Sequence, residues 1–338
     1  QKVELASGRE DVLEFWREHF PAWPSKKYAW LYEQNVFGQA GCWTLRRGSR
    51  VVGSAAVFPR DFVFRGQRLR GGITGDFGLD KRDRMFGPAL QLQRAIVDHS
   101  SFDLLYGSPN RHSEPVQLRA GFRVLGSTVR MVRVIRTDNY LAQRIQYAPA
   151  ARILAAVGNV LLDARFRRRR VDLTSYKIDL PLKFDERFNT LWRTVAAAST
   201  SLLGIRTKEF LNRRFVRCPY IDYHIFAVTR RSDRALVGYI VYRIVDRVAH
   251  VADCLAMDLT ANFDILLAAF VEHMRMLGFH AVSVLYLGDA AVVERLKGHG
   301  FTERSDRRNV VVWVRKGADP AGDLVDRNRW YFWEGDND

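Results

Sequence analysis

A short basic segment that contains a glycine carries the clearest chemical signal in the chain. It follows a predicted strand, precedes a predicted helix, and consists of Arg84, Met85, Phe86, Gly87, Pro88 and Ala89. The first backbone amides of a helix have no partner within the helix and lie at the positive end of its dipole. Gly87 allows the backbone to approach an anion closely, Pro88 suits the first helical turn, and Arg84 adds positive charge. The segment is therefore expected to bind an anion such as a pyrophosphate.

The elements that would position this segment are predicted from hydrophobic spacing and turn residues. Apolar residues at helical spacing predict a helix that begins near residue 8 and ends near Pro21. Residues 41–79 alternate short apolar runs with glycines, which indicates a meander of antiparallel strands. The first half is completed by a helix over 86–99, a buried strand over 102–110, a short helix over 113–122 and a closing strand pair over 123–135.

The same order of elements begins again in the second half of the chain. A second meander is predicted over 224–257, followed by a helix over 263–277, a strand over 281–288, a short helix over 290–301 and a last strand over 309–316. Two landmarks align: VVGSAAVF at Val51 matches LVGYIVYR at Leu236, and LRAGF at Leu118 matches LKGHGF at Leu296. The sequence therefore predicts an α+β fold with two copies of one unit, each a mostly antiparallel mixed sheet flanked by helices.

The expected domain organisation follows from this repeat. The predicted parts are a first domain over 1–145, a basic helical linker over 146–175, a second domain over 176–318 and an aromatic and acidic tail over 319–338. The linker ends in five arginines, from Arg165 to Arg170, which are either a solvated connector or a contact for phosphates or an anionic membrane. The tail contains Trp330 to Trp333, and we expect it to fold back onto the body rather than line a ligand site.

Composition sets broader limits. With 338 residues and an apolar share of 47%, the chain is long enough to bury two cores. Cys42, Cys218 and Cys254 lie far apart and form no metal-binding or disulfide pattern, which favours a reducing, cytoplasmic location. We predict no metal. The net charge of +16 favours an anionic partner, although nucleic acid is disfavoured because no basic stripe with interleaved aromatic residues is present.

The order of elements and the segment at residues 84–89 together resemble the Gcn5-related N-acetyltransferases. The cofactor loop of that family has Arg or Gln, two residues, Gly, one residue, and then Gly or Ala. The resemblance implies acetyl-CoA or another acyl-CoA as cofactor, with residues 84–89 at its diphosphate. It also implies backbone contacts to the cofactor from Phe77 and Leu79, and contacts to the pantetheine side from Asn110 and Ser113.

Candidate catalytic residues follow from the same resemblance and from the chemistry of acyl transfer. An ammonium must lose a proton before it can attack a thioester, and Asp76, on the strand that faces the cofactor in the family, is the candidate base. Many members have a Tyr as general acid four residues before the Gly of their Gly-Phe pair, but this chain has Gln117 there. An amide cannot donate a proton usefully, so either another group acts, with Tyr106 and His112 as candidates, or the thiolate simply leaves. The alternative for Tyr106 is a core residue of its strand.

The second half lacks the cofactor loop. The corresponding stretch reads DLTANFDILLAAF, without the required Arg, Gly and Ala, so it is not expected to bind CoA. Asp253 occupies about the place of Asp76, and the Cys254 that follows it is expected to be a buried apolar filler. This half is expected to pack against the first and to shape the acceptor pocket.

The resemblance extends to a bacterial group of tandem acetyltransferase-like proteins associated with polysaccharide biosynthesis, through YGSPNRHSEPVQLRAGFRVLG, the aromatic segment near Trp30 and WYFWEGDND. It implies an acyltransferase that acts on an amine or hydroxyl of a sugar or lipid-linked precursor, in the cytoplasm or at the inner face of the membrane. Two alternatives stay open. One is a Fem-type aminoacyl transferase that uses charged tRNA, and the other is a catalytically degenerate scaffold protein of a membrane-associated assembly.

Overall fold

The computed structural model describes residues 2–3, 8–19, 25–137, 154, 156–159, 172–319 and 321–337. The first half contains β1 (Lys2–Val3), α1 (Arg9–His19), α2 (Ser25–Tyr28), the π-helical turn η1 (Ala29–Glu33), β2 (Gly41–Arg47), β3 (Arg50–Pro59), β4 (Phe62–Phe64), β5 (Gln67–Leu69), β6 (Gly71–Leu79), the 3-10 turn η2 (Lys81–Asp83), α3 (Phe86–Asp98), β7 (Leu104–Gly107), α4 (Glu114–Arg119), β8 (Arg123–Ser127) and β9 (Val129–Val134).

The second half contains β10 (Tyr176–Asp179), α7 (Glu186–Ala198), β11 (Leu202–Gly204), α8 (Lys208–Leu211), the π-helical turn η3 (Asn212–Val216), β12 (His224–Arg230), β13 (Leu236–Val245), β14 (Val248–Ala256), α9 (Ala261–Met276), β15 (Ala281–Gly288), α10 (Ala290–Gly298), β16 (Thr302–Arg304), β17 (Asn309–Val314), the 3-10 turns η4 (Asp323–Val325) and η5 (Arg327–Arg329), β18 (Trp330–Trp333) and the 3-10 turn η6 (Glu334–Asp336).

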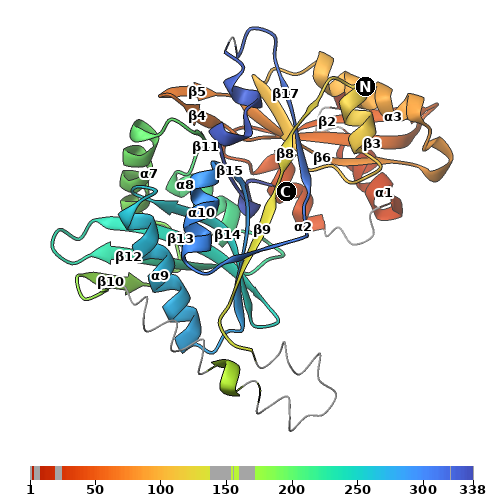
Figure 1. The fold of residues 1–338 in the computed structure, drawn as a ribbon. Coiled ribbons are helices and arrows are strands. Elements are labelled where there is room, and N and C mark those ends of the chain that lie inside the picture. Colours follow the sequence, from red (N-terminus) through yellow and green to blue (C-terminus); the bar gives the residue numbers. More distant parts are fainter. Residues whose placement is uncertain are drawn as a thin grey trace.

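These strands form two mixed sheets. Within the described residues, the first sheet has the order β1-β2-β3-β6-β7-β17-β8, and the second has the order β10-β12-β13-β14-β15-β18-β11-β4-β5. In the second sheet β9 also pairs with β15, and β16 pairs with β9. Most neighbours are antiparallel, but β6 pairs with β7, β14 with β15 and β11 with β18 in parallel. Helices flank the sheets (Figure 1). The predicted α+β class is confirmed.

The two halves exchange strands: β4, β5 and β9 of the first half lie in the second sheet, and β17 of the second half lies in the first sheet. The predicted closing pair of the first half does not stay in one sheet, because β9 leaves β8 and pairs with β15 and β16 of the second half. In return β17, predicted as the last strand of the second half, lies between β7 and β8 of the first. Figure 1 shows β17, in blue, among the strands of the first sheet. Since each sheet is completed by a strand from the other half, neither half can close its own sheet alone.

The two π-helical turns pack against each other at the contact between the halves. The Trp30 Nε1 donates to the main-chain oxygen of Arg213 at 2.9 Å, and the Arg213 guanidinium donates to the main-chain oxygen of Trp30. The same guanidinium lies over the Trp30 ring, 4.4 Å from its centroid. This contact fixes η1, and with it the aromatic residues that η1 carries toward the first sheet.

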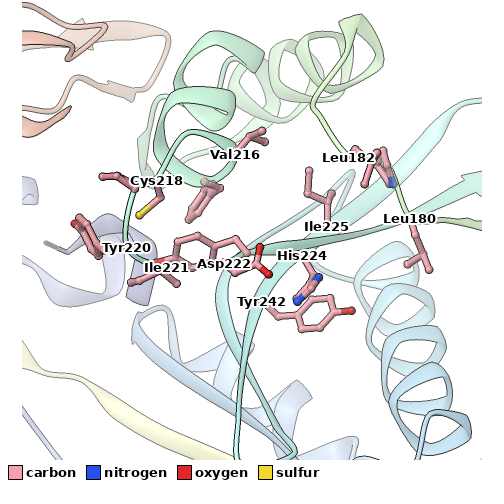
Figure 2. Close-up of a pocket in the computed structure, with 14 residues that line it drawn as sticks. Leu180, Leu182, Val216, Cys218, Tyr220, Ile221, Asp222, His224, Ile225 and Tyr242 are labelled. Atoms are coloured by element: carbon pink, nitrogen blue, oxygen red, sulfur yellow. The ribbon is translucent and has the colours of Figure 1, made fainter. Parts of the chain in front are cut away.

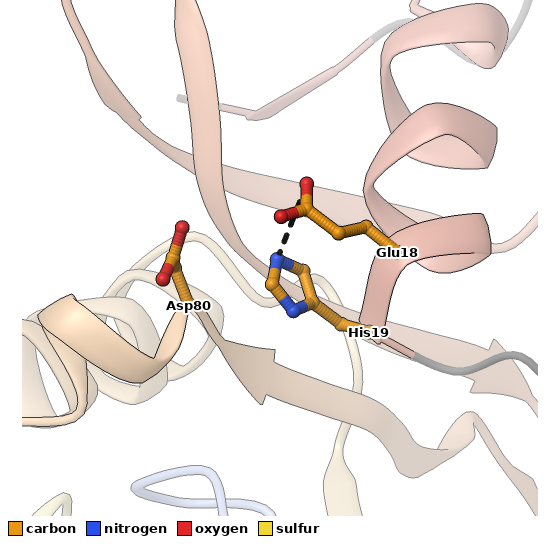
Figure 3. Close-up of side chains that lie close together, drawn as sticks. All are labelled: Glu18, His19 and Asp80. Carbon is orange, nitrogen blue, oxygen red and sulfur yellow. Dashed lines mark ion pairs between the residues drawn. The ribbon is translucent and has the colours of Figure 1, made fainter.

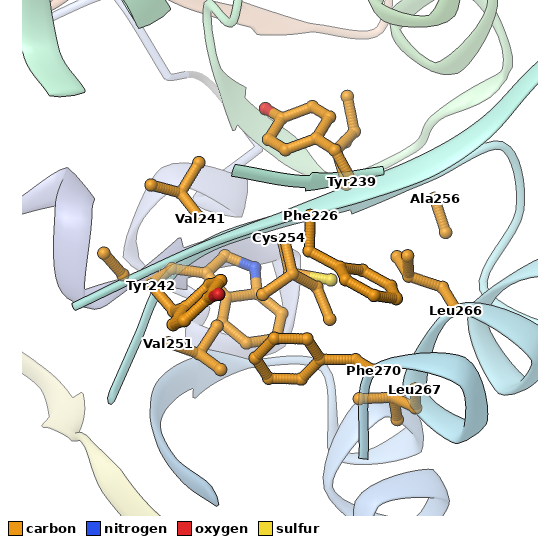
Figure 4. Packing of buried hydrophobic residues seen from close by; sticks show 14 of the residues in the cluster. Phe226, Tyr239, Val241, Tyr242, Val251, Cys254, Ala256, Leu266, Leu267 and Phe270 are labelled. Carbon is orange, nitrogen blue, oxygen red and sulfur yellow. The ribbon is translucent and has the colours of Figure 1, made fainter. Parts of the chain in front are cut away.

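The apolar cores lie between the sheets and their helices. In the second half, α9 packs its buried face against β12, β13 and β14, with contacts that include Phe226, Tyr242 and Phe270 (Figure 4). The helix α3 covers the first sheet in the same way through Leu92 and Ile96. Apolar residues at helical spacing on these helices, facing strands with long buried runs, explain why the sequence indicated their positions correctly.

Several predicted segments can be compared directly with the structure. The helices predicted over 86–99, 263–277 and 290–301 are α3, α9 and α10, each with an end that differs by up to three residues. The aromatic tail does fold back, since β18 is buried within the second sheet. The domain boundaries stay a prediction, and most of the proposed linker, including its arginine run, lies outside the described residues. Among the described residues, no helix has the length and apolar character needed to cross a membrane.

Candidate functional site: a cleft between two diverging strands

A cleft opens in the first sheet where β6 and β7 diverge. Their parallel pairing covers only the residues from Gly71 to Ile73, opposite Leu104 to Tyr106. Beyond it the edge of β6 that faces β7 has no partner strand among the described residues, which leaves backbone donors and acceptors for an extended ligand. The base of the cleft is closed by two hydrogen bonds: the Gln117 Nε2 donates to the Thr74 Oγ1 at 3.2 Å, which donates to the main-chain oxygen of Tyr106 at 3.3 Å.

A β-bulge changes the direction of β6 beside the cleft. The β3–β6 register shifts between Ser54, opposite Gly78, and Ala56, opposite Gly75, so that β6 has one extra residue. Within the bulge Asp76 adopts a φ of 50°, a left-handed conformation that costs a residue with a side chain some free energy. Its carboxylate accepts a hydrogen bond from the Tyr32 hydroxyl at 2.9 Å. Asp76 is therefore held at the cleft by the bulge and by η1 together.

The N-terminus of α3 faces the same cleft. Met85 caps α3 without a side-chain hydrogen bond, and no partner for the amides of Phe86 and Gly87 is found among the described residues. A Cβ placed on Gly87 would meet no atom within 4 Å, so the space above this backbone is open. The Arg84 Nε donates to the main-chain oxygen of Leu79 at 3.1 Å, which directs the guanidinium along the end of β6. Donors for an anion are thus available at the predicted position.

A cavity of about 610 Å³ lies between the end of β6, the N-terminus of α3 and the start of α4, and Asp76 is not among the residues that line it. Of the predicted site residues, those that line it are Phe77, Leu79, Arg84, Met85, Phe86, Ala89, Asn110, His112 and Ser113. Met85 and Phe86 are 58% and 49% exposed, so their side chains offer uncovered apolar surface at its mouth. Gly87 and Pro88 belong to the helix N-terminus beside it. Its size is within the usual range for a small-molecule site.

Asn110 and Ser113 are also used to begin α4. The Asn110 Oδ1 accepts hydrogen bonds from the amides of His112 and Ser113, at 2.9 and 3.0 Å. Its Nδ2 has no partner among the described residues and stays available to a ligand in the cavity. His112 is exposed, and its Nε2 accepts a hydrogen bond from the Nε of Arg111 at 3.1 Å.

The structure does not bring Tyr106 to the cavity. Its side chain is fully buried, packs edge-on against Phe62 and Trp330, and donates its hydroxyl to the main-chain oxygen of Asp336 at 2.7 Å. A phenol held in this way cannot reach a leaving group in the cleft. The substitute-acid role expected for Tyr106 is therefore corrected: Tyr106 is a core residue, and His112 is the remaining candidate of the two.

Tyr32 is a residue that the sequence did not single out. Burial, and then the negative charge of Asp76, raise the pKa of Tyr32 well above its ordinary value, so the phenol stays protonated and acts as a donor. It stacks on Tyr28 with ring centroids 4.7 Å apart. From sequence alone, aromatic residues at this spacing indicate only core, because the π-helical turn that directs Tyr32 toward Asp76 is a tertiary feature.

His19, at the end of α1, is a second such residue. Its side chain lines the cavity, is 10% exposed and lies 3.7 Å from the carboxylate of Glu18 (Figure 3). Glu18, His19 and Asp80 could in principle share a cation, since their ligand atoms lie within 4.8 Å of one another. However, Arg50 already donates to Glu18 at 3.2 Å and to Asp80 at 3.0 Å. Its positive charge compensates both carboxylates, so this cluster is best described as a charged border of the cavity.

Known proteins resemble this chain in structure and not in sequence. No family model matches the sequence, and no curated protein matches it. Among solved structures, a GCN5-related N-acetyltransferase from Anabaena variabilis is similar, with a TM-score of 0.63 and 14% identity over 93% of this chain and 72% of that one. A probable N-acyltransferase from Enterococcus faecalis has a TM-score of 0.64 and 11% identity over 93% and 71%. Eis1 from Mycobacterium abscessus has a TM-score of 0.58 and 13% identity over 96% and 75%.

The chain has the fold of the Gcn5-related N-acetyltransferases. At these identities the likeness concerns the fold alone, and it extends over nearly the whole chain. In this acetyltransferase fold, the diverging parallel strands and the helix that follows the first of them occur twice, as β6, β7 and α3 and again as β14, β15 and α9.

In the second copy the chain's own tail occupies part of the cleft, and a cavity of about 280 Å³ remains beside it. Parallel pairing of β14 and β15 covers Val248 to Val251, and beyond it β18 pairs with β15 through Tyr286 to Gly288. The Tyr331 hydroxyl donates to the main-chain oxygen of Cys254 on β14 at 2.9 Å. Burial raises the pKa of Cys254 well above its ordinary value, so its thiol is an inert filler as expected.

The helix N-terminus of the second copy is also occupied by protein. The Asp258 Oδ1 accepts hydrogen bonds from the amides of Thr260 and Asn262, at 2.9 and 3.2 Å, in the place that an external anion would take. Burial opposes ionisation, but the hydrogen bonds from Thr260 and Asn262 outweigh it and lower the pKa of Asp258. The carboxylate is therefore ionised at neutral pH and satisfies the helix itself.

Asp253 is the counterpart of Asp76 by register. The parallel pairing begins at Gly71 on β6 and at Val248 on β14, and each Asp lies at the same distance in sequence after that residue. It accepts a hydrogen bond from the Tyr239 hydroxyl at 2.8 Å, as Asp76 does from Tyr32. Unlike Asp76, it is fully enclosed and bound by Arg206, which also bonds Asp336 of the tail at 2.6 Å. Burial opposes the charge on Arg206, but the two carboxylates outweigh it and raise its pKa well above the ordinary value.

Proposed function

We propose that the chain is an acyl-CoA-dependent acyltransferase that works in the cleft of the first half, with acetyl-CoA or another acyl-CoA as the donor. The observation that carries this proposal is the 610 Å³ cavity between an unpaired strand edge and a helix N-terminus whose first amides have no partner among the described residues. Such amides are suited to a diphosphate, and the strand edge is suited to the amide groups of a pantetheine arm.

The residues around the cavity divide the tasks. Arg84 and the amides of Phe86 and Gly87 would hold the diphosphate, while β6 from Phe77 to Leu79 and the Nδ2 of Asn110 would face the pantetheine. When bound, acyl-CoA supplies an acyl group activated as a thioester. Met85 and Phe86 would lose exposed apolar surface on binding, which adds affinity.

We assign the role of general base to Asp76, which precedes the cavity-lining Phe77 on β6. The Tyr32 hydroxyl donates to its Oδ2 and fixes the carboxylate, which would take a proton from an attacking amine or hydroxyl. The proton needed by the departing sulfur would come from His112 or from solvent, because Tyr106 is buried and Gln117 bonds Thr74.

For the acceptor we propose an amine or hydroxyl of a sugar or lipid-linked precursor of a cell-surface polysaccharide, handled in the cytoplasm or at the inner face of the membrane. The support for this acceptor is the sequence resemblance of residues 106–126 and of the aromatic tail. The partly occupied cleft of the second half supports the expectation that this half shapes the acceptor side and binds no second cofactor.

The test has a binding arm and a chemical arm. Calorimetry with acyl-CoAs of different chain length, in the absence of RNA, should give saturable binding, and absence of binding to every acyl-CoA would exclude the proposal and favour the Fem-type alternative. Release of free thiol should then report transfer to an added acceptor. Asp76→Asn is expected to keep acyl-CoA affinity and to lower turnover by about 100-fold or more, the usual contribution of a general base. Binding without any turnover would leave the scaffold function.

A further inference from the structure

A larger cavity lies in the second half, away from the cofactor cleft. It has a volume of about 820 Å³, and its walls come from the segment before α7, from the stretch that joins η3 to β12, and from β13. Figure 2 shows the residues around it, which include Leu180, Leu182, Val216, Tyr220, Asp222 and Tyr242. None of these residues belongs to the acyl-CoA site proposed above.

The rim of this cavity exposes an unusual amount of apolar surface. Leu182 is 91% exposed, Leu180 is 53% exposed and Val216 is 44% exposed, although all three side chains are aliphatic. Each aliphatic side chain left in water gives up a hydrophobic stabilisation that a ligand could restore by covering it. Clustered exposure of this kind, around a concave wall, is typical of a binding site rather than of ordinary surface.

The inner wall is aromatic and fixed in place. Tyr223 packs edge-on against Phe215 with ring centroids 5.0 Å apart, and the ring centroids of Tyr242 and His224 are 5.3 Å apart. Burial raises the pKa of Tyr223 and of Tyr242, so both phenols stay neutral at physiological pH. The wall therefore offers ring faces and uncharged hydroxyls to a ligand.

One carboxylate stands in these surroundings. Asp222 is the only acidic residue among those that line the cavity, and no Lys or Arg lines it, although the chain has 53 Lys and Arg residues against 37 Asp and Glu. No hydrogen bond or ion pair to the Asp222 carboxylate is found among the described residues. Figure 2 shows this carboxylate between Ile221 and His224, facing the cavity. Asp222 is exposed to solvent, and a cation bound to it would also lie beside the aromatic faces of the wall.

We propose that this cavity binds an amphiphilic amine, with the ammonium group at Asp222 and the apolar body against Leu180, Leu182 and Val216. The aromatic wall would add cation–π attraction to the charge-assisted hydrogen bond. The site is separate from the acyl-CoA cleft, so it can exist whether or not the chain is an acyltransferase.

Three probes that share one alkyl chain isolate the contribution of the head group. Binding of n-octylamine, n-octanol and n-octanoate to the full chain is measured by calorimetry at neutral pH, without acyl-CoA. The amine is expected to bind about tenfold more tightly than the alcohol, because a hydrogen bond between charged groups is stronger than one between neutral groups. Octanoate is expected to bind more weakly than either. Absence of saturable amine binding, or equal binding of amine and octanoate, overturns the proposal.

Two variants separate the charge from the apolar rim. Asp222→Asn should abolish the preference for amine over alcohol and leave alcohol binding unchanged, since the side chain keeps its size. Leu182→Ser should weaken all three probes. The matched control is Leu277→Ser, because Leu277 is also an exposed leucine, at 55%, but lies outside this cavity. If Asp222→Asn keeps the amine preference, or if Leu277→Ser weakens binding as much as Leu182→Ser does, the site is elsewhere and the proposal is wrong.

Discussion

The same pair of diverging strands forms an open cleft in the first half and an occupied cleft in the second. In the first half, β6 and β7 diverge around a 610 Å³ cavity, and the amides at the start of α3 have no protein partner among the described residues. In the second half, β18 pairs into the gap beside β15, and Asp258 satisfies the start of α9. The same arrangement of diverging strands and helix can therefore either leave room for a ligand or be occupied by another part of the chain. The side chains around each cleft determine which of the two occurs.

The largest expected effect concerns the charges that anchor the tail in the second half. Arg206 is 1% exposed and bridges Asp253 and Asp336, so Arg206→Met would leave two buried carboxylates without this partner. We expect a loss of about 3–5 kcal/mol in the free energy of unfolding, measured by chemical denaturation. Arg187→Met, which removes a partly exposed ion pair with Asp185, should cost less than about 1 kcal/mol. Similar losses for both variants would contradict the role of the buried network.

A second substitution tests which helix N-terminus receives the cofactor. Gly87→Glu places a negative charge at the open start of α3, where it would oppose a diphosphate, so acyl-CoA affinity should fall by about 100-fold or more. Asn262→Glu makes the same change at the start of α9 and should leave affinity unchanged. Both affinities come from calorimetry. An effect of Asn262→Glu equal to that of Gly87→Glu would mean that the second half takes part in binding.

The two helix starts can also be interchanged. Met85 is the N-cap of α3 without a capping side chain, so Met85→Asp should stabilise the protein by about 0.5–1 kcal/mol and weaken acyl-CoA binding, because the new carboxylate competes with the diphosphate. Asp258→Ala should do the opposite for α9 and cost about 1 kcal/mol, without creating a second acyl-CoA site, since the tail leaves a cavity of only about 280 Å³ there. Thermal denaturation and binding stoichiometry check both variants. Two acyl-CoAs bound to Asp258→Ala would show that β18 does not block the cleft.

A further small effect concerns a single hydrogen bond of the tail. Tyr331→Phe removes the bond to the main-chain oxygen of Cys254 and keeps the ring in place, so the free energy of unfolding should fall by about 1 kcal/mol. Acyl-CoA affinity should not change. A Tyr331→Phe variant that binds acyl-CoA differently would indicate that the tail and the first cleft are coupled, for which Tyr106 and Asp336 provide a contact.

The pattern of residues 84–89 and the hydrophobic spacing of the flanking segments determined much of what could be known in advance. They placed α3, α9 and α10, and they indicated most of the residues that line the first cavity, though not His19, because helix periodicity and helix-start chemistry depend on neighbours in the sequence. The absence of Gly and Arg before α9 was also visible, and so was the position of Asp253. The role of Asp258 as an internal anion was not predicted, although an Asp that accepts from the amide two residues later is a known turn pattern.

Only the tertiary structure decided the rest. The exchange of β9 and β17, the partial occupation of the second cleft by β18 and the burial of Tyr106 all join segments that are far apart in the chain. Strand pairing depends on which edges meet after collapse, and a hydrophobic run is equally compatible with several partners. For the same reason the bond between Tyr32 and Asp76 could not be foreseen: the sequence supplies both groups, but the packing of η1 against the second half brings them together.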